Sequence, residues 1–270
     1  MVSQLDKCIA FKELHEGDEC FFIPNPWDAG SARLLEGMGF KALATTSQGY
    51  ALTLGKHDGR VTLEEKLKHC REVAEATTVP VNVDFEDGYA DEPEQVARHV
   101  RMVIETGTAG CSIEDFSREG QHIFDFNLAV ERVQAASEAV AEFDMPFQLT
   151  ARAENLIRGV SDLDDTIRRL QAYQDAGANV LYAPGVATLD DLAKVTSAVS
   201  LPFNVLGAFY PGASQEDFAR AGARRISVGS ALAWACIKPL LDAGDEMLEQ
   251  GTLTWLSGMA NGKRVRELLG

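Results

Sequence analysis

Apolar stretches of strand length alternate with amphipathic helical stretches along the whole chain, and the alternation repeats about every 25 to 35 residues. The apolar stretches are continuously hydrophobic, as expected of strands that are covered on both faces. They read CFFIPN, ALATTS, PVNVDF, GCSIED, FQLTARA, NVLYAP, PFNVLG and RRISVGS. Helices with acidic first turns are predicted between them, including residues 62–77, 94–105, 128–141 and 162–176. This βα rhythm predicts a (β/α)8 barrel, the TIM-barrel fold.

A glycine precedes four of the eight predicted strands, at Gly39, Gly107, Gly177 and Gly222. Glycine can adopt the left-handed conformation that ends a helix before the chain turns into a strand. The same glycine-terminated helix end recurs because the same βα unit is repeated along the chain. No Pro/Gly/Ser-rich linker interrupts the pattern, and 270 residues suit one closed barrel. We therefore expect a single domain over residues 1–270, with a C-terminal helical extension over about 252–270.

Composition narrows the class of protein. A hydrophobic content of 46% with 24% charged residues is globular, and no apolar run approaches the roughly 18 residues that span a bilayer. The N-terminal segment has no basic region followed by an apolar run, so we expect a cytoplasmic protein without a membrane partner. The five cysteines are odd in number and contain no C-x-x-C pair, which favours buried thiols over disulfides or a zinc ribbon.

The acidic balance bears on the ligand. A net charge of −16 would repel nucleic acid and anionic lipid, so neither is expected as a partner. An anionic substrate must therefore meet a local cation, which would be a metal ion or a suitably placed arginine.

Carboxylates gather where two of the predicted strands end. In a TIM barrel the functional side chains lie at the C-terminal ends of the strands and in the loops that follow. The third strand ends in Asp84, Glu86 and Asp87, and the fourth ends in Glu114 and Asp115. Asp84 and Glu86 point to the same side of an extended strand, and Glu114 can reach across from the neighbouring strand. Crowded carboxylates repel one another, and a hard divalent cation relieves this repulsion. The pattern predicts a Mg²⁺ site, with Mn²⁺ as an alternative; solvated rim acids and helix caps are the other interpretation.

Two further polar residues lie on predicted strands. Arg152, at the end of the fifth strand, could bind a substrate carboxylate through two parallel hydrogen bonds, or form a structural ion pair with Glu154 or Glu114. Asn204 lies inside an apolar strand and needs a hydrogen-bond partner, either as a core amide or as a substrate-binding residue.

Taken together, these strand ends resemble the isocitrate lyase and phosphoenolpyruvate mutase superfamily over nearly the whole chain. The resemblance is carried, in order, by N-P-W-D-A-G-S-A-R (25–33), A-T-T-S-Q-G (44–49), L-G-K-H-D-G (54–59), D-F-E-D-G-Y (84–89), I-E-D (113–115), A-R (151–152), N-V-L (204–206) and S-V-G-S (227–230).

The resemblance implies a lyase that cleaves or forms a C–C bond next to the carbonyl of a small anionic 2-oxo or 2-hydroxy acid through a metal-stabilised enolate. It implies that Asp84, Glu86 and Glu114 hold the metal, largely through water. Asp58 would assist the metal or the substrate, and Arg152 would bind the substrate carboxylate. The backbone N–H groups around Thr46, Ser47 and Gln48 would stabilise the enolate oxygen.

The loop after the fourth strand departs from the pattern of named members. Isocitrate and 2-methylisocitrate lyases carry a K-K/R-C-G-H loop with a catalytic cysteine, whereas this loop reads F-S-R-E-G-Q-H-I-F (116–124). A proton could instead be handled by His122 on a mobile loop, by Arg118 or by metal-bound water. The P–C mutases carry a lysine-rich gating loop that is also missing here. Neither named activity can be transferred from the resemblance alone. A P–C enzyme of the phosphonopyruvate hydrolase or mutase type is one alternative to the C–C lyase, and a non-catalytic ligand-binding barrel is another.

Assembly follows from the same resemblance, which implies homodimers or homotetramers. In such assemblies a swapped C-terminal helix packs on the neighbouring barrel. The apolar residues Leu253, Trp255, Leu256 and Met259 would suit such a contact, and a tail folded on its own barrel is the alternative.

Overall fold

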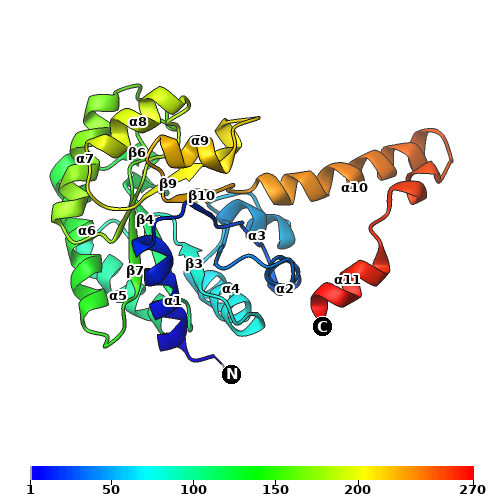
Figure 1. The fold of residues 1–270 in the computed structure, drawn as a ribbon, viewed down its shortest axis with the longest axis horizontal. Helices are drawn as coiled ribbons and strands as arrows, with labels where there is room; N and C mark the ends of the chain where they lie inside the picture. Colours follow the sequence, from blue (N-terminus) through cyan, green and yellow to red (C-terminus); the bar gives the residue numbers. More distant parts are fainter. Residues whose placement is uncertain (1) are drawn as a thin grey trace.

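Eight parallel strands form the centre of the molecule and confirm the predicted barrel (Figure 1). The structure is a computed structural model that describes residues 2–270. The hydrogen-bonded order is β1-β10-β9-β8-β7-β4-β3-β2. Ala44 N donates to Pro24 O at 3.0 Å and links the two edges of the sheet. Each strand falls within one predicted apolar stretch: β1 (Phe21–Phe22), β2 (Leu43–Ala44), β3 (Val81–Asp84), β4 (Gly110–Glu114), β7 (Gln148–Arg152), β8 (Val180–Tyr182), β9 (Phe203–Leu206) and β10 (Arg225–Ser227).

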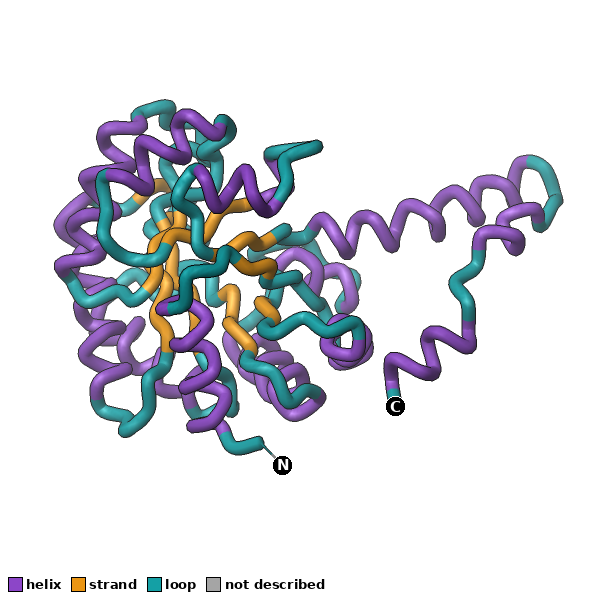
Figure 2. The backbone as a smooth tube through the Cα atoms, viewed as in Figure 1, coloured by secondary structure: helices purple, strands orange, loops and turns teal. Residues whose placement is uncertain are grey.

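Helices cover the outside of the strands, as the colouring by secondary structure shows (Figure 2). The four helices predicted by residue range are confirmed to within two residues at each end. The glycines expected to end helices have positive φ angles, between 83° at Gly222 and 100° at Gly39. The covering helices are α2 (Ala29–Gly37), α3 (Ser47–Thr53), α4 (Leu63–Ala76), α5 (Pro93–Ile104), α6 (Phe126–Ala141), α7 (Leu163–Asp175), α8 (Leu189–Ser197) and α9 (Gln215–Arg220), with a 3-10 turn, η1 (Gly207–Phe209), after β9.

Helix α1 (Gln4–Glu16) closes the N-terminal end of the barrel. Phe11 packs so closely on Gly110, the first residue of β4, that a Cβ atom there would lie 2.9 Å from the ring. His15 is buried and its Nδ1 donates to Phe11 O at 2.7 Å. Its Nε2 therefore accepts from Arg225 Nη1 at 3.3 Å, which requires the neutral ring. Burial, assisted by the charge of Arg225, lowers the pKa of His15 to about 3.

This histidine makes stability depend on pH. A base whose pKa is lower in the folded state stabilises the fold fully above its unfolded pKa, and the contribution is lost as pH falls from about 6.5 towards the folded value. We expect the free energy of unfolding to be about 2 kcal/mol lower at pH 5 than at pH 8 because of His15 alone. Urea unfolding at both pH values checks this. In His15→Gln the difference between the two pH values should shrink by that amount, and an unchanged difference would contradict the assignment.

The segment after β4, expected to be a loop, contains a small antiparallel hairpin of β5 (Phe116–Ser117) and β6 (His122–Ile123). Arg118 fastens it to the barrel. Its backbone N–H donates to Asp87 Oδ2 at 2.9 Å, its Nη1 donates to Val61 O at 2.9 Å, and its guanidinium lies 4.0 Å from the centre of the Tyr89 ring.

The C-terminal segment leaves the barrel as an arm (Figures 1 and 2). The arm consists of α10 (Ala231–Glu249), the 3-10 helix η2 (Thr254–Gly258) and α11 (Gly262–Leu269), which turns back so that Leu268 contacts Gly37 of α2. Large apolar side chains along it are exposed: Trp234, Leu240, Leu241, Met247, Leu248, Leu253, Leu256 and Met259. The assignment of one domain with an extension over about 252–270 stays a prediction. Within residues 2–270, every helix falls short of the length or hydrophobicity needed to cross a membrane.

Candidate active site

A cavity of about 390 Å³ opens at the C-terminal ends of the strands, where the fold predicts chemistry. It brings together eight of the ten residues that the sequence singled out, from β3, β4, β7, the start of α3 and the loops after α3 and β3. These lining residues are Thr46, Ser47, Gln48, Asp58, Asp84, Glu86, Glu114 and Arg152.

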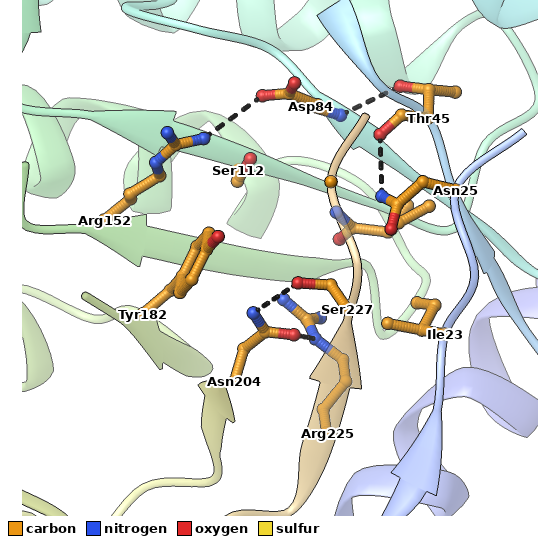
Figure 3. A pocket seen from close by; sticks show the side chains of 13 residues that line it. Ile23, Asn25, Thr45, Asp84, Ser112, Arg152, Tyr182, Asn204, Arg225 and Ser227 are labelled. Carbon is orange, nitrogen blue, oxygen red and sulfur yellow. Dashed lines mark hydrogen bonds and ion pairs between the residues drawn. The ribbon is translucent and has the colours of Figure 1, made fainter. Parts of the chain in front are cut away.

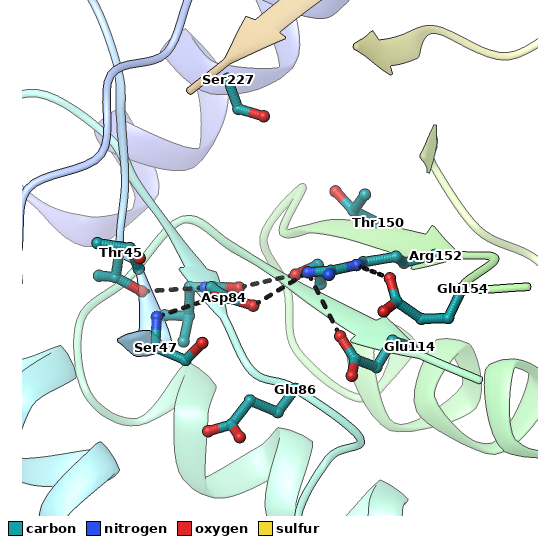
Figure 4. A network of polar contacts seen from close by, with 12 residues as sticks. Thr45, Ser47, Asp84, Glu86, Glu114, Thr150, Arg152, Glu154 and Ser227 are labelled. Atoms are coloured by element: carbon teal, nitrogen blue, oxygen red, sulfur yellow. Dashed lines mark hydrogen bonds and ion pairs between the residues drawn. The ribbon is translucent and has the colours of Figure 1, made fainter. Parts of the chain in front are cut away.

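Asp84 lies at the centre of the polar contacts (Figure 4). Its Oδ2 accepts from Ser47 N at 2.9 Å, and its Oδ1 lies 3.5 Å from Arg152 Nη1. Its own backbone N–H donates to Thr45 Oγ1 at 3.0 Å, which fixes the end of β3 beside β2. Burial acts to raise the pKa of Asp84, but Arg152, Lys66 and the Ser47 amide together lower it. The carboxylate is therefore held in its ionised form.

Arg152 lies among carboxylates from three strand ends (Figure 4). Its Nε donates to Glu154 Oε1, and its Nη1 lies 3.3 Å from Glu114 Oε2 as well as 3.5 Å from Asp84. The ion pairs expected as the structural interpretation are thus present. They also leave the guanidinium facing the cavity, where it can exchange a protein carboxylate for a substrate carboxylate.

Glu86 and Glu114 are buried carboxylates near Asp84, and they are neighbours because Glu114 N donates to Glu86 O at 2.9 Å. Glu86 has a φ angle of 48°, and its Oε1 accepts from the Tyr89 hydroxyl at 2.7 Å. Burial raises the pKa of Glu86. Burial and the nearby charges of Glu154 and Asp84 raise the pKa of Glu114 well above its ordinary value, against the opposing effect of Arg152. Both carboxyl groups therefore take up a proton more readily than solvated glutamates do.

The donor set suits a divalent cation. Five carboxylates but only three guanidinium groups line the cavity, so that even with the charge of the nearby buried Lys66 one negative charge stays unmatched when all groups are ionised. Within residues 2–270, no three His, Cys, Asp or Glu side chains converge closely enough to hold an ion directly. A set of hard oxygens spread around a cavity fits Mg²⁺, which usually keeps several of its waters.

The first turn of α3, which follows β2, is held by tight packing. Gly49 lies so close to Thr46 Cγ2 and Trp27 Cβ that an added Cβ would meet them at 2.5 and 3.0 Å. Gln48 is held by the first turn of the arm, since its Oε1 accepts from Ser230 Oγ at 2.5 Å and from Trp234 Nε1 at 3.3 Å. The Ser47 N–H, one of the expected enolate donors, is bonded to Asp84 in this structure.

Asp58 faces the same cavity from the loop after α3. Asp58 is exposed overall, but partial desolvation of its carboxyl group and the neighbouring charge of Asp84 raise its pKa, while a hydrogen bond with the Ser47 side chain opposes the shift. Asp58 therefore takes up a proton more readily than a solvated aspartate does.

The two remaining candidates lie outside this cavity. Asn204 lines a smaller cavity deeper in the barrel (Figure 3), where its Nδ2 donates to Ser227 Oγ at 2.9 Å and its Oδ1 accepts from Arg225 Nε at 2.8 Å. It has the contacts of a satisfied core amide. His122 is exposed on β6, and its ring packs edge-on against Phe124. The roles of all ten candidates stay predictions.

Sequence reasoning did not place Arg158 in the site, and it considered Glu154 only as an ion-pair partner. Both line the cavity because residues 154–158 form a turn in which Arg158 N donates to Glu154 O at 3.0 Å. The spacing of Glu154 and Arg158, four residues apart, was the available signal. Phe116, Ile157 and Leu206 add apolar surface to the same cavity.

A family model described as phosphoenolpyruvate phosphomutase matches residues 11–248, which include every strand of the barrel and the whole cavity lining. The chain belongs to this family. The predicted superfamily is thereby confirmed, and with it the prediction of an enzyme of the lyase and mutase type.

Individual members of the phosphoenolpyruvate phosphomutase family agree with this assignment. A solved structure of a Burkholderia cenocepacia protein described as a lyase/mutase is 44% identical, covers 97% of this chain and 95% of its own, and superposes with a TM-score of 0.93. A protein named probable 2-methylisocitrate lyase 2 of Corynebacterium glutamicum is 30% identical over 67% of this chain and 60% of its own length. The oxaloacetate decarboxylase of Pseudomonas entomophila is 27% identical over 89% of this chain and 84% of its own length.

Proposed function

We propose that this protein is a Mg²⁺-dependent lyase that cleaves or forms a C–C bond next to the carbonyl of a small 2-oxo or 2-hydroxy acid. The observation that carries the proposal is the cavity lining, in which Arg152 and an excess of carboxylates meet beside Ser47. The names of the relatives, a 2-methylisocitrate lyase and an oxaloacetate decarboxylase, support C–C chemistry on such acids.

The residues that line the cavity have three proposed roles: metal binding, binding of the substrate carboxylate, and stabilisation of the oxyanion. Asp84, Glu86 and Glu114 would hold the metal, largely through water, and Mn²⁺ could replace Mg²⁺ there. When bound, such an ion would draw electron density from the carbonyl oxygen of the acid. Arg152 would bind the substrate carboxylate with paired hydrogen bonds. The N–H groups around Thr46, Ser47 and Gln48 would face the developing oxyanion.

Proton handling is assigned to side chains that already face the cavity. Asp58 is proposed to hold a proton on its carboxyl group, in line with its raised pKa. Arg118 also lines the cavity, but its guanidinium is occupied by Val61 O and the Tyr89 ring. His122 could take part only if the β5–β6 hairpin moved to bring it over the site.

A substrate panel tests the proposal. Purified protein with Mg²⁺ is incubated with oxaloacetate, 2-methylisocitrate, related 2-hydroxy and 2-oxo dicarboxylates, and phosphonopyruvate, and release of pyruvate or glyoxylate is followed. We expect turnover of at least one C–C substrate that disappears with EDTA and returns with added Mg²⁺. Turnover of phosphonopyruvate alone would identify a P–C enzyme. If folded, metal-binding protein turned over no compound of the panel, the result would favour a non-catalytic barrel.

We also propose that the arm packs on a second copy of the chain, giving a homodimer or homotetramer. The exposed apolar side chains of α10 and η2 are the supporting observation, because an isolated protein rarely leaves so much apolar surface in water. Sedimentation should give a mass of two or four chains. A Leu240→Glu/Leu248→Glu variant should shift it towards one chain, whereas a Glu13→Gln control on α1 should not. A monomeric wild-type protein would contradict the proposal.

A further inference from the structure

Two arginines and two glutamates alternate in a ring on one wall of the cavity. Glu154 accepts from Arg152 Nε with one oxygen and from Arg158 Nε with the other, the latter at 3.2 Å. Glu114 lies 3.3 Å from Arg152 Nη1 and 3.6 Å from Arg158 Nη2. The two guanidinium groups are therefore held side by side by the same pair of carboxylates.

The ring is rigid on its protein side. Glu154 is fully buried, and its backbone N–H donates to Asp115 Oδ1 at 2.7 Å, which ties the turn to the end of β4. The guanidinium of Arg158 lies 3.7 Å from the centre of the Phe116 ring, an arrangement that fixes the plane of the group. Arg158 is thus positioned from two directions, by a carboxylate and by an aromatic face.

Arg158 nevertheless keeps hydrogen-bond donors for a ligand. Among residues 2–270, the side-chain hydrogen bonds of Arg158 use only its Nε, and the 3.6 Å contact with Glu114 is longer than a hydrogen bond. Its side chain is 40% exposed, whereas that of Arg118 across the cavity is 18% exposed and bonded to Val61 O. Of the three guanidinium groups that line the cavity, that of Arg158 is the most exposed, and its two Nη groups make no hydrogen bond within the described residues.

We propose that Arg158 binds the distal carboxylate of a dicarboxylate substrate and so selects diacids over monoacids. The inference rests on the proposed function, in which Arg152 binds the carboxylate next to the reacting carbonyl. A planar fork held at a fixed place beside Arg152 matches a second carboxylate of the same molecule. Glu154 acts as a positioning residue, because it orients both guanidinium groups.

Matched ligands test this without turnover. Titration calorimetry on the Mg²⁺-loaded protein compares 2-oxoglutarate with 2-oxopentanoate, and malate with 2-hydroxybutanoate, because each pair differs only in the distal carboxylate. We expect wild-type protein to bind at least one diacid more tightly than its monoacid partner. Arg158→Gln should weaken that diacid by about 10- to 100-fold and change the monoacid by less than about twofold. Arg158→Lys, which keeps the charge and loses the fork, should fall between.

The control removes an arginine of the surface. Arg168 of α7 has a 67% exposed side chain outside the cavity, so Arg168→Gln should leave all four affinities unchanged. Equal affinity of wild-type protein for diacid and monoacid would overturn the proposal, and so would an equal loss of both in Arg158→Gln. Because the readout is binding, a protein that discriminates but turns nothing over would fail the proposed function and leave the role of Arg158 intact.

Discussion

Replacing Asp84 by alanine should lower turnover of any acid that the wild-type protein processes by roughly 10²- to 10³-fold or more. Three functions are lost at once. The Ser47 N–H loses its hydrogen-bond acceptor, and Arg152 loses one of its carboxylate partners. The proposed metal site also loses its central carboxylate. Binding of Mn²⁺, followed by its electron paramagnetic resonance signal, should weaken in the same variant.

Two comparisons isolate the charge of Asp84 from its shape. Asp84→Asn keeps an acceptor for the Ser47 N–H but removes the negative charge, so we expect turnover to stay low while the fold is retained. Asp175→Ala, at an exposed position at the end of α7, should keep wild-type turnover. An Asp84→Ala protein that is folded and fully active would remove Asp84, and the metal site around it, from the mechanism.

Replacing Arg152 by alanine should reduce the free energy of unfolding of the metal-free protein by about 3 to 5 kcal/mol. The arginine compensates Glu154, which is fully buried, and Glu114, which is nearly so. Removing one partner of a buried ion pair leaves uncompensated charge in a poorly solvated place. Urea unfolding at constant pH measures the loss, and binding of 2-oxo acids should disappear with it.

The pH dependence of this variant follows from the same carboxylates. Arg152 opposes the rise in the pKa of Glu114, so its removal should raise that pKa further. An acid whose pKa is raised by folding binds more protons in the folded state, so its contribution to stability falls as pH rises. The deficit of Arg152→Ala should therefore be larger at pH 8 than at pH 5. Arg152→Ala/Glu154→Gln should recover part of the stability; equal deficits at both pH values would argue against the charge explanation.

The barrel could be predicted because its signals are local. Each strand coincides with a short apolar run in the sequence. The helix ends before four of the strands need a left-handed conformation, which glycine adopts most readily; the residues are Gly39, Gly107, Gly177 and Gly222. Asp84, Glu86 and Glu114 stood out because charge at the end of a buried strand requires an explanation.

The features that escaped prediction depend on contacts that the sequence does not display. Arg158 reaches the cavity only because a turn after β7 folds it over Phe116. His122 is exposed on a hairpin, which a hydrogen bond from Arg118 N to Asp87 Oδ2, 31 residues earlier in the chain, fastens to the barrel. The apolar residues of the C-terminal extension, such as Leu253 and Leu256, could be recognised in the sequence, but apolar residues do not show which barrel they will cover.

The hydrogen bonds from Ser230 and Trp234 to Gln48 join the root of the arm to the first turn of α3, which begins at Ser47. Any force that bends or releases α10 is therefore transmitted to the place where substrate is expected to sit. If neighbouring copies of the chain hold the arm, dissociation of the oligomer at low concentration would loosen the first turn of α3. The specific activity of such an enzyme would then fall on dilution, and the abundance of the protein in the cell would itself set how well each molecule works.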